Sequence, residues 1–229
     1  MTEKTAILFD NVRFCYDEVC AINDVHFTVP ANCITALIGP NGGGKSTLLK
    51  ILSGLLHPDE GSYMIQDDYK IGYVSQFTDF DLTFPMTVME MVLLGTLCQN
   101  IRPFCKYTKA QKEKAHDALT KVGLEGYGGR GINQLSGGEL KRSVIARAIA
   151  SDADIIVLDE PDSSLDVEAA ADLYNVLRKI KEDRTILIAS HHLDEVLDIA
   201  DQVLYVNSKV ETYTSAEEIR QKLGDGIFI

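Results

Sequence analysis

The sequence predicts an α/β fold with a largely parallel sheet, an N-terminal antiparallel β region and an inserted helical subdomain. Three observations indicate this fold. Apolar strands alternate with amphipathic helices after residue 150, a glycine-rich turn joins a strand to a helix near residue 40, and residues 85–150 have mainly helical patterns. We expect one domain over residues 1–229, with an α/β core formed by 1–84 and 151–229 and a helical subdomain formed by 85–150.

The composition is that of an ordinary globular protein, with 45% hydrophobic and 24% charged residues. The net charge of −12 provides no basic footprint, so we expect no nucleic-acid partner. No apolar run approaches the ~18 residues that span a bilayer, and the first residues lack the apolar segment of a secretory signal. The five cysteines, at positions 15, 20, 33, 98 and 105, form no CxxC pair, so we expect reduced thiols.

The N-terminal elements follow from the spacing of apolar residues. Val25, Phe27 and Val29 alternate with polar residues, as in a strand with one buried face. Two apolar strands are expected at 34–38 and 70–74, with a helix between them whose apolar positions run over 48–56.

Capping boxes mark the helical segment and the last helix. Thr87 with Glu90, and Thr108 with Gln111, fit the pattern of a hydroxyl followed three residues later by an acidic or amide side chain. Ser215 begins a short final helix in the same way. Strands are expected at 155–158, 185–189 and 203–206, with helical stripes between them that indicate βαβ units.

The sharpest chemical signal is a glycine-rich loop that fits the phosphate-binding pattern G-x-x-x-x-G-K-[ST]. Its glycines let successive N–H groups point at phosphate oxygens, and the helix that follows adds a partial positive charge. Lys45 would supply charge to the β- and γ-phosphates, and the Ser46 hydroxyl could ligate Mg²⁺. The candidate phosphate-binding residues are Gly39, Asn41, Gly42, Gly43, Gly44, Lys45, Ser46 and Thr47.

A second candidate segment is the acidic end of the strand at 155–158. In phosphate-loop proteins an aspartate placed like Asp159 holds Mg²⁺, usually through water. Glu160 would then be positioned to polarise a water aimed at the γ-phosphate. Alone, such a pair is more often a solvated strand end, but the phosphate loop in the same chain favours the nucleotide site.

A third candidate segment, Ser136-Gly137-Gly138-Glu139, begins a helix. Ser136 and Glu139 form a capping box, which by itself would explain both residues. The two glycines would also expose N–H groups at a helix N-terminus, which is a second anion-binding arrangement.

The order of these segments resembles the ATP-binding subunit of ABC transporters. Leu-Ser-Gly-Gly is the signature of that family, and here it lies between the phosphate loop and Leu-Asp-Glu-Pro. The resemblance runs from about residue 9 to 210 and implies a P-loop NTPase (RecA-like) core of the ABC ATPase type, with 85–150 as the signature subdomain. It also implies that the chain is an ATPase that uses ATP and Mg²⁺.

The resemblance also implies roles for residues outside these segments. Tyr16 would stack on adenine, with Phe14 as the alternative aromatic. Gln76 would touch Mg²⁺ and the attacking water. His191 would contact the γ-phosphate, although the adjacent His192 competes for this assignment.

In the family, two subunits pack head to tail when ATP binds. The resemblance therefore implies a homodimer in which each ATP also meets the partner's signature, while a loop carrying Asp166 crosses the interface. The signature residues expected to act in trans are Ser136, Gly137, Gly138 and Glu139.

Catalysis would follow the family pattern, with Glu160 as general base for water. The implied ligands of Mg²⁺ are Ser46, Gln76 and, through water, Asp159. The subunit would lie at the cytoplasmic face of the cell membrane, bound peripherally to a polytopic permease. An extracytoplasmic substrate-binding protein would belong to the same system.

Three positions depart from the common family pattern. Glu139 stands where glutamine is usual, Asp162 where threonine is common, and Asn32 where a glycine usually precedes the phosphate-loop strand. None of the three removes a phosphate or magnesium contact, so we expect competent hydrolysis.

The cargo is suggested by two features, the phosphate-loop sequence and the run Phe84-Pro-Met-Thr-Val88 after Gln76. Both resemble zinc/manganese-type metal importers, although Phe84 and Val88 could instead be core residues of the helical subdomain. Other cargoes (haem, iron chelate, cobalamin), a small exporter ATPase and an iron–sulfur assembly ATPase stay open. We expect the cargo metal not to bind this chain, because its Cys and His residues show no ligand spacing.

Overall fold

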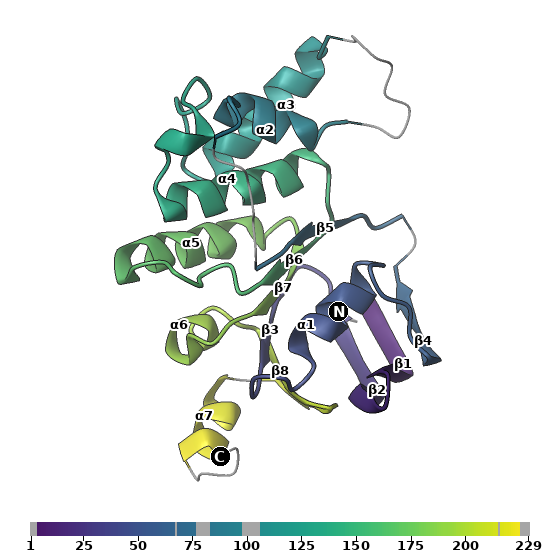
Figure 1. Ribbon diagram of the computed structural model, residues 1–229. Helices are drawn as coiled ribbons and strands as arrows, with labels where there is room; N and C mark the ends of the chain where they lie inside the picture. The colour runs from purple at the N-terminus through teal and green to yellow at the C-terminus, as the bar shows by residue number, and fades with distance from the viewer. Residues whose placement is uncertain (1–3, 67, 77–82, 98–105, 215, 225–229) are drawn as a thin grey trace.

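A six-stranded sheet forms the centre of the protein in the computed structural model, which describes residues 4–66, 68–76, 83–97, 106–214 and 216–224 (Figure 1). Its strands lie in the order β5-β6-β7-β3-β8-β9 and are parallel except for β9, which pairs antiparallel with β8. They are β3 (Ile34–Ile38), β5 (Ile71–Val74), β6 (Ile155–Asp159), β7 (Thr185–Ala189), β8 (Gln202–Asn207) and β9 (Lys209–Tyr213). The predicted α/β fold with a largely parallel sheet is confirmed.

A three-stranded antiparallel sheet lies beside it, in the order β2-β1-β4. Its strands are β1 (Thr5–Tyr16), β2 (Val19–Pro30) and β4 (Glu60–Ile65). This sheet contains the β region expected within the first thirty residues. The sequence analysis did not predict β4 or β9.

The hairpin of β1 and β2 corrects the expectation of reduced cysteines. Cys15 and Cys20 are partners in its register and form a disulfide. The sequence alone suggested free thiols because the two residues are five positions apart without a CxxC pattern, yet a tight hairpin places such residues face to face. Cys33 is buried and donates its Sγ–H to the Pro30 carbonyl. Positions 98 and 105 lie outside the described residues.

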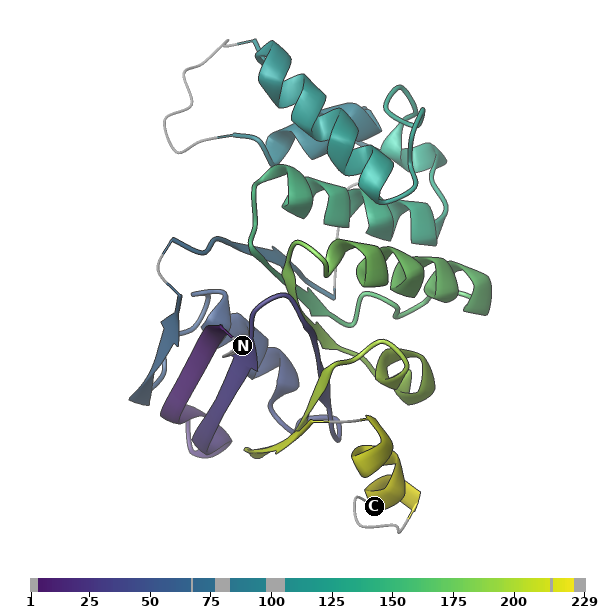
Figure 2. The same cartoon turned by 180° about the vertical axis from the view of Figure 1, so that it is seen from behind.

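The helices form layers on both sides of the six-stranded sheet (Figures 1 and 2). The first, α1, lies between the two sheets, α5 and α6 cover the opposite face, and α2, α3 and α4 stack beyond α5. The helices are α1 (Lys45–Leu52), α2 (Val88–Leu94), α3 (Lys109–Lys121), α4 (Gly137–Ala150), α5 (Val167–Ile180), α6 (Leu193–Leu197) and α7 (Ala216–Gly224), with a 3₁₀ turn η1 (Ile132–Gln134).

The central strands supply two hydrophobic cores, because successive side chains of a strand point to opposite faces. In β7, Ile186 and Ile188 join the core under α2–α6, whereas Leu187 and Ala189 join the core around α1. Every residue of β3, β6 and β7 is buried, as expected of parallel strands covered on both faces. The carboxyl ends of these strands are therefore held in a fixed register.

Helix boundaries agree with the capping signals but not everywhere with apolar spacing. The capping boxes of Thr87, Thr108 and Ser136 are all formed. The helix expected over 48–56 ends instead at Leu52, because Gly54 takes a left-handed backbone (φ +72°). The predicted cap at position 215 lies outside the described residues. No helix in the described part of the chain is both long and apolar enough to cross a membrane.

Candidate nucleotide-binding site

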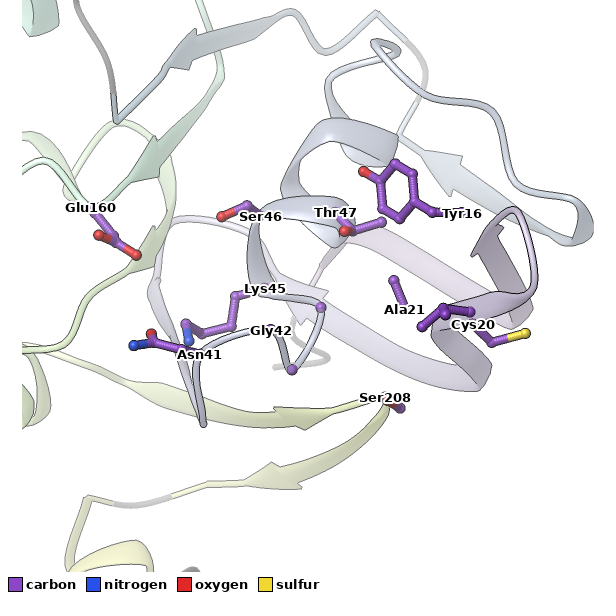
Figure 3. Close-up of a pocket in the computed structure, with 13 residues that line it drawn as sticks. Tyr16, Cys20, Ala21, Asn41, Gly42, Lys45, Ser46, Thr47, Glu160 and Ser208 are labelled. Carbon is purple, nitrogen blue, oxygen red and sulfur yellow. The ribbon is translucent and has the colours of Figure 1, made fainter.

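The glycine-rich loop between β3 and α1 borders a pocket of about 390 Å³ (Figure 3). Every predicted phosphate-binding residue except Gly39 lines it. Figure 3 shows Tyr16 on one side of the loop and Glu160 on the other. The complete lining is Tyr16, Val19, Cys20, Ala21, Asn41, Gly42, Gly43, Gly44, Lys45, Ser46, Thr47, Glu160 and Ser208.

Gly39 is where β3 turns into the loop. Its φ of +140° is a conformation that L side chains rarely adopt, and a Cβ there would lie 2.1 Å from the Val206 carbonyl oxygen of β8. Glycine is therefore required by the backbone conformation and by the close approach of two main chains. The loop keeps its shape because it rests against a strand of the sheet.

Lys45 is the first residue of α1 and is almost entirely buried. Its Nζ donates hydrogen bonds to the carbonyl oxygens of Gly39, at 2.8 Å, and Pro40, at 3.0 Å. Burial lowers the pKa of the ammonium group, and the negative charges of Glu160 and Asp159 oppose this shift. The lysine is thus held at the loop, within the electrostatic influence of both carboxylates.

Asp159, at the end of β6, faces the first turn of α1. The Ser46 Oγ donates to its Oδ1 at 2.9 Å, and the Tyr73 hydroxyl donates to its Oδ2 at 3.3 Å. Burial raises the pKa of this carboxyl, while the two hydrogen bonds lower it. Tyr73, on β5, was not predicted, because its aromatic side chain reads as an ordinary strand residue.

Glu160 is held between two side chains from different loops. The Gln76 Nε2 donates to its Oε2 at 2.5 Å, and the His191 Nε2 lies 2.9 Å from its Oε1. His191, and not His192, therefore contacts Glu160. His192 is the N-cap residue of α6, and its backbone N–H donates to the Ser190 Oγ. The structure brings together three residues from separate parts of the chain, with Gln76 84 positions before Glu160 and His191 31 positions after it.

The far end of the pocket is formed by the β1–β2 hairpin and by the turn after β8. Tyr16 lines the pocket and is 47% exposed, so its ring is available to a ligand. Phe14 packs edge-on against Tyr16, with ring centroids 4.9 Å apart. Ser208 also lines the pocket, and its N–H donates to the Gly43 carbonyl. No local pattern marks Ser208, because only the folding of β8 and β9 brings it to the loop.

The signature segment lies at the start of α4 and is not part of this pocket. Ser136 and Gly137 are exposed, whereas Gly138 is buried against α5, where a Cβ would lie 2.8 Å from the Ala169 Cβ. The Ser136 N–H donates to Glu139 at 2.8 Å and lowers the pKa of that carboxyl.

Asp166 is the N-cap of α5, where its Oδ1 accepts the Ala169 N–H at 2.8 Å. It is exposed, as is the neighbouring Val167. Within one chain, Ser136 and Asp166 thus cap α4 and α5, and both residues remain exposed on the surface.

The sequence and the fold match known proteins. The ABC transporter family model matches residues 22–163. The manganese transport system ATP-binding protein MntB of Listeria monocytogenes is 37% identical, over 90% of this chain and 89% of that protein. The zinc uptake system ATP-binding protein ZurA of the same species is 36% identical, over 97% of this chain and 90% of its own.

Solved structures give the same result. The ADP conformation of MJ1267, an ATP-binding cassette of an ABC transporter, is 29% identical and superposes with a TM-score of 0.88, over 98% of this chain and 96% of that chain. An inward-facing putative metal-chelate type ABC transporter is 30% identical with a TM-score of 0.84, over 94% of this chain and 85% of that chain. The chain therefore belongs to the ABC transporter family, as one of its ATP-binding, ATP-hydrolysing subunits.

Proposed function

We propose that this ATPase powers the import of a divalent metal ion, zinc or manganese, through a separate membrane permease. The relatives described above are named for manganese transport and zinc uptake, which supports this cargo class. In the run after Gln76, Val88 is fully buried in the helical core, whereas Phe84 is 58% exposed and accessible to a partner. Positions 77–82 of that segment lie outside the described residues.

The observation that carries the catalytic part of the proposal is the Glu160 carboxylate, held by Gln76 and His191 at the edge of the phosphate-loop pocket. In this position Glu160 acts as general base for a water aimed at the γ-phosphate. His191 and Lys45 stabilise the charge that develops on the transferring phosphoryl group. Tyr16 stacks on the adenine ring.

The residues present suit Mg²⁺, which prefers oxygen ligands and takes several of them from phosphates and water. Ser46 and Asp159 place a hydroxyl and a carboxylate oxygen 2.9 Å apart beside the loop. Ser46 and Gln76 would hold the ion directly and Asp159 through water. When bound, Mg²⁺ supplies charge neutralisation for the phosphates.

The dimer part of the proposal assigns the signature to the partner's nucleotide. Ser136, Gly137, Gly138 and Glu139 lie outside their own chain's pocket, with Ser136 and Gly137 exposed, as a site used in trans requires. Asp166 and its exposed neighbour Val167 lie in the same interface. In this proposal residues 85–150 form the helical signature subdomain, and ATP binding closes a homodimer.

The closing and opening of this dimer drive the permease. The proposed complex lies at the cytoplasmic face of the cell membrane, and an extracytoplasmic substrate-binding protein delivers the ion.

The catalytic assignment is tested with Glu160→Gln, which keeps the size of the side chain but removes the base. We expect a roughly 10²–10⁴-fold lower ATPase rate and unchanged MgATP binding. A closed dimer should accumulate, which light scattering would detect. Glu182→Gln, which changes an exposed carboxylate on the turn after α5, is the matched control and should keep the wild-type rate. A wild-type rate in Glu160→Gln would show that Glu160 is not the base.

The cargo is tested in the source cells. We would replace the wild-type protein by Glu160→Gln, grow the cells at limiting metal and measure total cellular metal content element by element. Selective loss of zinc or manganese is expected. An unchanged metal profile in cells without a redundant importer would refute metal import and leave the ATPase assignment intact.

A further inference from the structure

A buried hydrogen-bonded cluster joins the two loops that carry Glu160 and His191. Its centre is Asp162, which follows Glu160 by two residues and is 1% exposed. The Oδ2 of Asp162 accepts hydrogen bonds from the Tyr174 hydroxyl and from the Ser190 Oγ, each 2.5 Å long. Both donors are buried as well. Short hydrogen bonds to a carboxylate are stronger than those between neutral groups. The cluster therefore holds Asp162, Tyr174 and Ser190 in defined positions.

Three elements meet in this cluster. Asp162 belongs to the segment after β6, Ser190 directly follows β7, and Tyr174 lies in the middle of α5. Because Ser190 gives its proton to Asp162, its oxygen is oriented to accept the His192 backbone N–H, at 2.9 Å. His191 lies between Ser190, whose hydroxyl binds Asp162, and His192, whose backbone N–H binds the same hydroxyl. The backbone on both sides of His191 is therefore held by the Ser190 hydroxyl.

The strand ends join the same two loops from the other side. Asp159 and Ala189 are paired in the sheet register, and the Glu160 N–H donates to the Ala189 carbonyl at 2.9 Å. The contact between the Glu160 and His191 side chains is a further link between the two loops. Moving either loop would open this contact.

A lysine of α4 lies near Asp162 and binds the Gln76 backbone beside Glu160. Among the described residues, the buried Oδ1 of Asp162 has no hydrogen-bond partner. Lys141 on α4 lies within the electrostatic influence of this carboxylate. The Lys141 Nζ donates to the Gln76 carbonyl at 3.0 Å, and the Gln76 side chain binds Glu160. Lys141 thus connects α4 to the residue whose side chain binds Glu160.

We propose that Asp162 is a positioning residue for ATP hydrolysis. It fixes the loops that carry Glu160 and His191 and so keeps the general base aligned with the attacking water. The inference rests on the proposed roles of Glu160 and His191.

The test compares Asp162→Ala, which removes both hydrogen bonds and the charge, with Asp162→Asn, which keeps an acceptor oxygen. We expect Asp162→Ala to lower kcat by roughly 100-fold, the effect of a displacement of about 1 Å at a catalytic group. The KM for ATP should stay within about twofold, because no residue that lines the pocket is changed. Asp162→Asn should recover part of kcat.

A matched control separates positioning from general destabilisation. Thr35→Val also removes a buried hydrogen bond, the one from Thr35 to Gln202, at 3.0 Å between β3 and β8. It should lower the melting temperature without lowering kcat. All variants are compared as folded protein, verified by thermal melting.

A double-mutant cycle with His191→Ala, measured by single-turnover hydrolysis, tests the proposed route. If Asp162 acts through His191, the loss caused by Asp162→Ala becomes smaller in the His191→Ala background. Full additivity, or a wild-type kcat in folded Asp162→Ala, would overturn the inference. Glu160→Gln measured in parallel distinguishes the two failures: only its retained activity would count against the proposed function itself.

Discussion

The close contact between the phosphate loop and β8 leads to a quantitative prediction for Gly39→Ala. The substitution adds one carbon atom, which would lie 2.1 Å from the Val206 carbonyl oxygen, whereas ordinary contacts lie at 3.4–4 Å. This oxygen cannot move away as a flexible side chain would, because it belongs to the backbone of β8, which is paired with strands on both sides. The loop would have to retreat by roughly 1 Å to restore a normal contact.

A displacement of this size moves the groups proposed to bind phosphate. We expect kcat/KM for ATP to fall by roughly 100-fold, which corresponds to about 2.7 kcal/mol of transition-state stabilisation. The alanine must also adopt a φ near +140°, which adds backbone strain of about 1–3 kcal/mol to the folded state.

The assay combines a nucleotide-binding titration with steady-state ATPase measurements on folded protein. Gly54→Ala is the matched control, because Gly54 also has a positive φ, of +72°, but has no atom within 4 Å of the added carbon. It should lower the melting temperature while keeping the ATPase rate. If Gly39→Ala were as active as Gly54→Ala, the contact with Val206 would not define the loop, and our reasoning would be refuted.

Two further predictions concern the helical segment. Gly95→Ala would place a Cβ 2.1 Å from the Arg147 carbonyl oxygen, so overpacking of about 1–3 kcal/mol should outweigh a backbone-entropy gain of about 0.4–1 kcal/mol. Its melting temperature should fall, whereas that of Gly129→Ala, with no atom within 4 Å, should not; an unchanged value for Gly95→Ala would contradict the close packing of α2 and α4. For Glu139, the Ser136 N–H holds the carboxyl pKa below its ordinary 4.5, so the capping box stabilises the fold above that pH and loses this contribution as the pH falls through the lowered value. The difference in melting temperature between wild type and Glu139→Gln should therefore shrink from about pH 6 to pH 3, and a constant difference would exclude the ionised cap.

Local sequence patterns predicted the elements whose signals are themselves local. The glycine loop, the acidic end of β6 and the capping boxes each depend on a few consecutive residues, and each lies where expected. The order of three motifs sufficed to indicate the family, which the comparisons confirm.

Features that depend on pairing between distant segments were not predictable in this way. β4 begins Glu60-Gly-Ser and is largely exposed at a sheet edge, so it lacks the alternation of a half-buried strand. Ser208 reaches the pocket only because β9 turns back beside β8. Likewise, the partners of Asp162 come from α5 and from the end of β7, and no spacing in the sequence connects them.

The backbone of Glu160 has an evolutionary consequence. Its φ of +47° lies in the left-handed region, where a residue other than glycine, asparagine or aspartate is disfavoured. Folding alone would favour glycine here, so a glutamate at this position is conformationally costly. Under the catalytic role proposed for Glu160, position 160 is where substitutions that ease folding and substitutions that abolish turnover would coincide in a lineage released from ATP hydrolysis. Loss of activity there would meet no resistance from selection for stability.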